Sequence, residues 1–244
     1  MGKNELSVLD PAQLPSTQNA SDNVFDELAK SQDYLGRLQL FTKGKAVDKR
    51  LIRGGEYGVP KSAEDITVLG EEIHVLVLAR RAKAIDMSDG EAIFVSHDNE
   101  SDEFKRIAAQ SQEKESHCMY GPSFLVYEES TGQFLEFFCG SKSARNVAKE
   151  IYPFLPLTAA DIEARGLKDE KPHGPLPMTL RSKLVEKGTY TWHVPVVVKR
   201  STPITPPSLE KAIAEINKFI NPPADGVERV PEAETKATKK SRAR

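Results

Sequence analysis

The apolar positions in the middle of the chain follow the spacing of β-strands. Residues 72–79 (EIHVLVLA) and 92–97 (AIFVSH) are nearly unbroken apolar runs with β-branched side chains, typical of strands buried on both faces. Residues 123–140 form two alternating, aromatic-rich arms around Glu-Ser-Thr-Gly and predict a hairpin. Residues 178–188 and 189–199 predict two later strands, and a proline within the second indicates an edge or a bulge.

Three segments instead repeat their apolar residues at helical spacing. They are residues 100–114, 143–152 and 208–220. The first and third begin with a serine cap, and the second stops at Pro153. The middle of the chain is therefore predicted to contain strands, a hairpin, a helix, two further strands and a closing helix.

This order of elements predicts the fold class. Three strands, a helix and two strands is the order of an OB-type Greek-key barrel. We expect an α+β, β-rich fold with an OB-like Greek-key barrel, an inserted helix at 100–114 and a C-terminal helix. Other α+β sheets would produce the same order, so they stay open as alternatives.

The same pattern divides the chain into one domain and two tails. Residues 33–220 are expected to form a single OB-like domain, and this length suffices to bury a core. Residues 1–32 are polar and are expected to be disordered or loosely attached. Residues 221–244 are expected to be a disordered tail, acidic at first and basic at its end.

Composition narrows the function classes only slightly. A formal net charge of −2 neither favours nor opposes nucleic acid, so the distribution of charge matters more. The start of the chain lacks the pattern of a signal peptide, and no apolar run reaches the ~20 residues of a membrane span. We expect a cytoplasmic protein, with its two cysteines as small buried hydrophobes.

Residues 137–151 (FFCGSKSARNVAKEI) place glycine, serine and lysine where a strand meets a helix. A Walker A loop needs glycine directly before lysine and another glycine five residues earlier, and neither is present. Two interpretations remain. Ser141 or Ser143 caps the helix, or Lys142 and Arg145 at the helix start receive a backbone phosphate.

Two basic segments are candidates for binding a polymer backbone. Residues 37–53 carry six basic side chains against one acid, with Phe41 and Tyr57 nearby, as in single-strand binders. The alternative is a solvated charged loop. Further along, Arg81 and Lys83 are expected on one face of a strand and Arg80 on the other, which predicts a basic stripe or an ordinary strand end in water.

Aromatic side chains near the hairpin are candidate platforms for stacking on bases. One face of residues 134–139 is apolar throughout and suits the core, which leaves Phe134 and Phe138 on the other face. Glu136 lies between these two rings and would repel phosphate unless a neighbouring cation neutralises it. Tyr127 and Trp192 are further ring candidates, and burial in the core is the alternative for all of them.

Catalytic chemistry has little support in the sequence. The five histidines lack metal-ligand spacing, and no catalytic residue, metal or cofactor is predicted. Asp86, Asp98 and Glu100 are the carboxylates that a metal-dependent nuclease would bring together, and this class stays open as an alternative.

Residues 33–59 and 121–157 resemble largely uncharacterised phage- and plasmid-encoded proteins and, more loosely, phage single-stranded DNA-binding proteins with OB-type cores. The resemblance covers residues 33–220. It implies a basic, aromatic-lined groove around Lys43–Arg53, Arg80–Lys83 and Lys142. One departure is the basic end KKSRAR, where many such binders have an acidic tail that recruits partners.

We therefore expect sequence-tolerant binding of single-stranded DNA in phage-type replication or recombination. The phosphate contacts are assigned to Lys43, Lys45, Lys49, Arg50, Arg53, Arg80, Arg81, Lys83, Lys142 and Arg145. The stacking contacts are assigned to Phe41, Tyr57, Phe134 and Trp192. Replication or recombination proteins and a second copy of the chain are further candidate partners. The alternative is a phage structural or host-interaction protein that uses its sheet as an interface and ignores DNA.

Overall fold

The structure is a computed structural model that describes residues 35–62, 64–88, 91–113 and 116–222. The N-terminal segment 1–32 and the tail from residue 223 onward lie outside the described residues. The predictions made for them stay predictions.

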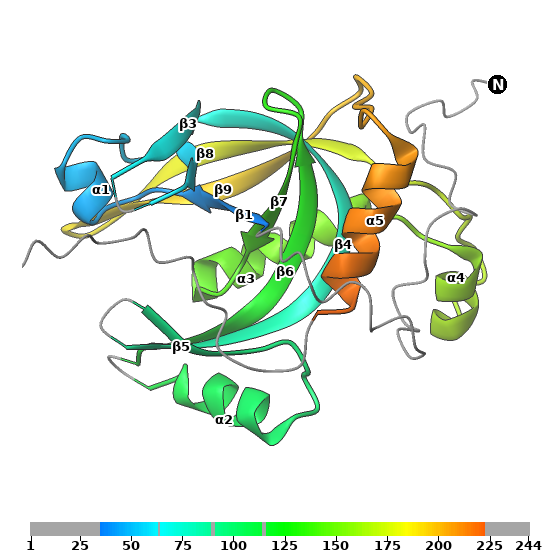
Figure 1. Cartoon of the computed structure of the whole chain (residues 1–244), viewed down its shortest axis with the longest axis horizontal. Helices are drawn as coiled ribbons and strands as arrows, with labels where there is room; N and C mark the ends of the chain where they lie inside the picture. The colour runs from blue at the N-terminus through cyan, green and yellow to red at the C-terminus, as the bar shows by residue number, and fades with distance from the viewer. Residues whose placement is uncertain (1–34, 63, 89–90, 114–115, 223–244) are drawn as a thin grey trace, which may run out of the picture.

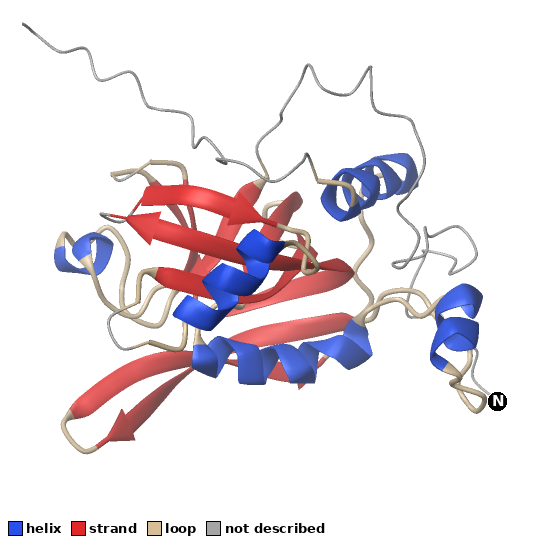
Figure 2. Ribbon diagram, turned by 90° about the horizontal axis from the view of Figure 1, so that it is seen from below, coloured by secondary structure: helices blue, strands red, loops and turns tan. Residues whose placement is uncertain are grey.

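The fold is a strand-rich, mixed α/β architecture built on one large sheet (Figures 1 and 2). Its strands are β1 (Gly36–Leu40), β2 (Tyr57–Pro60), β3 (Ile66–Gly70), β4 (Glu72–Ser88), β5 (Glu91–Ser96), β6 (Cys118–Glu128), β7 (Gln133–Phe138), β8 (Pro177–Lys187) and β9 (Tyr190–Lys199). The helices in the described part are α1 (Lys45–Asp48), α2 (Asp102–Gln110), α3 (Lys142–Ile151), α4 (Ala159–Arg165) and α5 (Leu209–Ile220), and a 3-10 turn (Tyr152–Phe154) extends α3.

The sheet is open. Its strand order is β3-β2-β1-β7-β6-β4-β8-β9, with β5 paired to β4 beside this path. Only the pair of β1 and β7 is parallel among the described pairs. The predicted strand-rich class with helices is confirmed. An OB-like barrel is not confirmed, because no described pairing joins the two end strands, β3 and β9.

Most elements that the sequence pattern predicts are present. The predicted helices at 100–114, 143–152 and 208–220 correspond to α2, α3 and α5, and the hairpin corresponds to β6 and β7. The helix α4 was not predicted, although Thr158 and Asp161 form a reciprocal capping box at its start. The short strands β1, β2 and β3 were missed too, because each has only four or five residues.

Helices cover both faces of the central strands. Side chains of β4 alternate between two cores, with Val75 and Val77 in the first and Leu76 and Leu78 in the second. The first core is completed by α3 and the second by α5, while α2 covers a smaller cluster around Ala84. The prediction of a strand buried on both faces is confirmed, and β4 runs beyond residue 79 to Ser88.

Strands β8 and β9 continue past the body of the sheet. The pairing of β8 with β4 ends at Arg181, and from there to Lys187 its described partner is β9 alone. We name this two-stranded part, residues 182–187 and 190–195, the arm. At about 3.4 Å per residue it projects by about 20 Å, and Figure 2 shows it as the long hairpin at the lower left.

Gly121 on β6 is a sensitive point of this packing, since a Cβ there would lie 2.2 Å from the carbonyl oxygen of Cys139. We expect Gly121→Ala to lower the free energy of unfolding by about 2–3 kcal/mol, because the backbone must move apart. Urea unfolding measures this. The control Asn146→Ala changes an exposed side chain on α3 and should stay within about 0.5 kcal/mol of the parent. An equally small effect for Gly121→Ala would contradict the packing described.

Candidate nucleic-acid interface

The register of the arm sorts its side chains into two faces. Direct partners across an antiparallel pair lie on the same face, and alternate residues along a strand share a face. One face, which we name the outer face, carries the pairs Lys183–Val194, Val185–Trp192 and Lys187–Tyr190. The opposite, inner face carries Ser182–Pro195, Leu184–His193 and Glu186–Thr191 and continues the pair Leu180–Val197 of the first core.

The outer face combines aromatic rings with cations. Tyr190 is 76% exposed, Trp192 is partly exposed and Lys183 and Lys187 are exposed. The two rings lie two residues apart on one strand, about 7 Å along it. Because the acid of the arm, Glu186, points to the inner face, a polyanion on the outer face meets rings and positive charge together.

A tight turn fixes this arrangement. Gly188 has φ +61°, which a residue without Cβ adopts at no steric cost. It belongs to a two-residue turn between Lys187 and Tyr190, which pair with each other across the hairpin. Of the outer-face rings and cations, sequence reasoning identified Trp192 and missed Lys183, Lys187 and Tyr190. The signal that was missed is the Lys-Gly-Thr-Tyr turn. Once residues 178–188 and 189–199 are treated as the two strands of one hairpin, this turn sets their register.

The cationic loop, residues 43–53, lies at the same end of the molecule as the arm (Figures 1 and 2). The neck of the loop, residues 41–42 and 54–57, packs against the arm, since a Cβ on Gly55 would lie 2.5 Å from the imidazole of His193. His193 Nδ1 in turn lies 2.9 Å from Ser182 Oγ, and the Tyr57 hydroxyl donates to the Arg181 carbonyl at 3.2 Å. The base of the arm and the neck of the loop are therefore in direct contact.

Within this loop the cations reach solvent and the rings do not. Lys43, Lys45, Arg50 and Arg53 are exposed, and the exposed Lys49 pairs with Glu64 at 2.8 Å. The two aromatic side chains assigned to stacking, Phe41 and Tyr57, are buried, Tyr57 completely. Their assignment as stacking platforms is wrong, because both rings pack inside the protein.

The second basic segment is a buried ionic cluster. Arg81 and Lys83 do point to one face of β4, as predicted, but Lys83 is fully buried. They donate to the two oxygens of Glu136 at 2.8 and 2.7 Å, and Ser123 Oγ donates to the first oxygen at 2.7 Å. The predicted basic stripe is wrong at these two positions, since the cations neutralise Glu136 under α5. Arg80 on the other face is exposed, 5.0 Å from the ring centre of Tyr152.

The environment of Glu136 keeps its carboxyl ionised. Burial by itself would raise its pKa, but Lys83 and Arg81 outweigh this and hold the pKa well below its ordinary value. Phe134 beside it is also buried and packs against Tyr127 with ring centres 5.2 Å apart. Its assignment as a stacking platform is therefore wrong as well.

The strand-to-helix junction before α3 contains a cap. Ser141 Oγ accepts a hydrogen bond from the Ala144 amide at 3.2 Å, so the capping interpretation is confirmed, with Ser141 in that role. The Arg145 guanidinium bonds within the protein: it donates to the carbonyls of Tyr120 and Gly140 at 2.9 and 2.6 Å. Lys142 is exposed, so a phosphate contact there stays a prediction.

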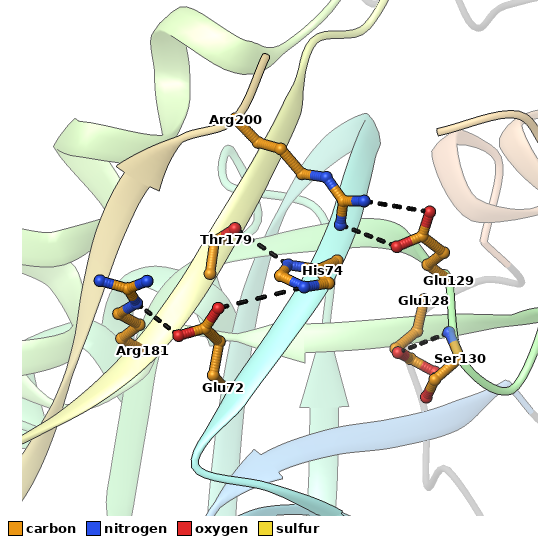
Figure 3. A network of polar contacts seen from close by, with 8 residues as sticks. All are labelled: Glu72, His74, Glu128, Glu129, Ser130, Thr179, Arg181 and Arg200. Carbon is orange, nitrogen blue, oxygen red and sulfur yellow. Dashed lines mark hydrogen bonds and ion pairs between the residues drawn. The ribbon is translucent and has the colours of Figure 1, made fainter. Parts of the chain in front are cut away.

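In a polar network on β4 and β8, a hydroxyl, an imidazole and a carboxylate follow one another as in a catalytic triad (Figure 3). His74 Nδ1 lies 3.0 Å from Thr179 Oγ1, and its Nε2 lies 4.0 Å from Glu72. Thr179 is buried, however, so a substrate cannot reach its hydroxyl, and Glu72 also accepts from Arg181. Nearby, Arg200 pairs with Glu129 at 2.7 Å. The contacts of His74 and Glu72 link β4 to β8, and the Arg200–Glu129 pair links the end of β9 to the turn after β6.

The carboxylates of the nuclease alternative serve local structure. Asp86 pairs with Arg106 at 3.1 Å, and Asp98 accepts from the Glu100 amide at 2.9 Å. Across the described ranges, no three His, Cys, Asp or Glu side chains are grouped so that they could hold a metal ion.

His97 makes stability depend on pH. Burial first, then the charges of Arg81 and Lys83, lower its pKa from 6.5 to about 4. The unfolded chain therefore binds a proton between these values that the folded chain does not, and stability falls as pH falls. We expect a loss of about 2 kcal/mol between about pH 7 and pH 5 in urea unfolding. His97→Gln should flatten this slope, and an unchanged slope would contradict the assignment to His97.

No family model matches the chain, and comparisons with curated proteins and with solved structures find no match. Within the described part, no helix has both the length and the apolar character needed to cross a membrane.

Proposed function

We propose that the protein binds single-stranded DNA, with the outer face of the arm as its base-stacking surface. One observation carries the proposal: two accessible rings, Tyr190 and Trp192, lie on one face with Lys183 and Lys187 and without an acid. Rings that stack on bases beside cations that neutralise phosphates are what sequence-tolerant single-strand binding needs. The spacing of about 7 Å between the two rings along the strand and their exposure to solvent suit an extended, unpaired DNA strand.

The strand order supports the same proposal. The five strands β7-β6-β4-β8-β9 follow the order 3-2-1-4-5, and α3 lies between the third and fourth strands in sequence. We propose that they form a partly open OB-type unit, to which β1, β2 and β3 are added and in which β5 and α2 are an insertion. The arm is then the hairpin between strands 4 and 5, a region that OB-folds use for oligonucleotides.

Binding of this kind is tolerant of sequence, because every base has a π-face for stacking. Such an activity suits replication or recombination of the phage type, where unpaired strands of any sequence must be covered. The basic residues at the end of the chain then add non-specific affinity for the same polymer.

A second candidate function has its own observation. Leu184 on the inner face is 49% exposed, and the edges of the arm have no described third strand. An unpaired ribbon with apolar side chains can add to the sheet of another protein or of a second copy. A protein of this class would oligomerise or bind a host protein and would not bind DNA.

Trp192 is the single tryptophan of the chain and lies on the proposed surface, so its fluorescence reports binding directly. We expect oligo-dT to quench this fluorescence at low salt. The affinity should fall steeply at higher salt as counterion release is lost, with a slope of about −0.7 per phosphate contact. An absence of binding at low salt would exclude the proposed function, and a concentration-dependent oligomer would then favour the second candidate.

Side-chain variants locate the site on one face of the arm. Tyr190→Ala should weaken oligo-dT binding roughly tenfold or more, since stacking contributes about 1–3 kcal/mol per base. The matched control Leu184→Ala removes an exposed side chain from the inner face of the same arm and should leave the affinity unchanged. Equal effects of the two variants would mean that the outer face is not the binding surface.

A further inference from the structure

The cationic loop contains an arginine where the backbone favours glycine. Arg50 has φ +60°, and it is the one residue other than glycine with positive φ among the described residues. A side chain with a Cβ is disfavoured in this conformation, whereas glycine adopts it at no steric cost. The other described positions with positive φ carry glycine: Gly44, Gly55, Gly70, Gly132, Gly166 and Gly188.

The backbone at Arg50 closes the end of α1. Its amide donates to the Val47 carbonyl at 3.0 Å, and the Leu51 amide donates to the Ala46 carbonyl at 3.0 Å. Glycine at this position would preserve both bonds, because they involve main-chain atoms only. The Arg50 side chain is exposed and makes no hydrogen bond or ion pair in the described part of the chain. The fold therefore gives no reason for an arginine at this position.

The loop that presents Arg50 is held in one shape. Its neck is closed by hydrogen bonds from the Gly55 amide to the Phe41 carbonyl at 2.7 Å and from the Phe41 amide to the Glu56 carbonyl at 2.9 Å. The Glu56 carboxylate accepts from the Arg53 amide at 2.8 Å, and Ile52 is buried. A strand that binds here meets a loop backbone that is already ordered, so the entropy lost on binding is limited to that of the cationic side chains.

The position and charge of the loop suit a polymer backbone. The loop adds Lys43, Lys45 and Arg53 to Arg50, while Asp48 is its one acid. The contact of Gly55 with His193 fixes the neck against the inner face of the arm. The loop therefore lies on the inner side of the arm, and a strand stacked on the outer face has to cross the edge of the arm to meet it.

We infer that the cationic loop is a preorganised phosphate-binding element for the strand held by the arm, and that Arg50 keeps its disfavoured conformation in order to contact phosphate. This inference rests on the proposed function. It adds a second contact region and a residue whose contribution is to binding and not to folding.

The test compares Arg50→Gly with Arg50→Lys and with Arg165→Gln, which removes an exposed charge on α4 at the opposite end of the molecule. Each variant is titrated with oligo-dT of about four and about sixteen nucleotides, with Trp192 fluorescence as the readout and salt varied. Thermal unfolding of each variant is recorded in parallel.

For Arg50→Gly we expect an unchanged or higher Tm and a several-fold weaker affinity for the long oligonucleotide. Its salt slope should shrink by about 0.7–1. The short oligonucleotide, which the arm alone can hold, should bind as it does to the parent. Arg50→Lys should retain most of the affinity, and Arg165→Gln should match the parent throughout.

Failure of the inference is separable from failure of the proposed function. If the parent protein shows no quenching with either oligonucleotide, both fail together. If the parent binds but Arg50→Gly has the parent's affinity and salt slope, the loop takes no part and only the inference fails. A clear drop in the Tm of Arg50→Gly would show that Arg50 serves the fold and would overturn the inference as well.

Discussion

The carboxylate of Glu136 is the point on which the central sheet depends. Arg81 and Lys83 reach it from β4, Ser123 reaches it from β6, and Glu136 itself belongs to β7. Arg81 also donates to the Phe219 carbonyl at 3.2 Å and lies 4.3 Å from that ring centre, which ties α5 to the cluster. One buried acid thus connects three strands and a helix. Breaking such a group from one side leaves an uncompensated buried charge, at a cost of about 3–5 kcal/mol.

The arm exists because the sheet ends abruptly beside it. Strand β4 starts at Glu72, and the chain before it turns at Gly70 into β3. The Ser182 amide still finds the Glu71 carbonyl at 2.9 Å, and beyond this bond β8 has no described neighbour except β9. The rigid body of the sheet therefore holds the base of a ribbon whose far part is free to meet a ligand on its outer face.

The sequence predicts the body of this fold better than its site. Long periodic segments identify β4, β6, β7, α2, α3 and α5, because their burial follows their spacing. The positive charges of Arg81 and Lys83 do not mark an exposed face, since an alternating pattern shows which residues share a face but does not show which face is covered. The answer depends on Glu136, which is distant in sequence: a neutralising cation was foreseen for it, but the pattern did not show that Arg81 and Lys83 are the cations. The assignment of Phe41, Tyr57 and Phe134 as stacking rings is wrong for the same reason, whereas Trp192 stays partly exposed on the arm.

The parallel pairing of β1 with β7 has a consequence for how the protein is made. Gly36 pairs with Leu135, so β1 leaves the ribosome well before its partner does. At about 5–20 residues per second the early strand waits several seconds without its neighbour. Long-range parallel pairing of this kind is slow to form, and during the delay its open edge can pair wrongly with other chains. Yield in the cell should therefore depend on synthesis rate and chaperones more strongly than the stability of the finished protein would suggest.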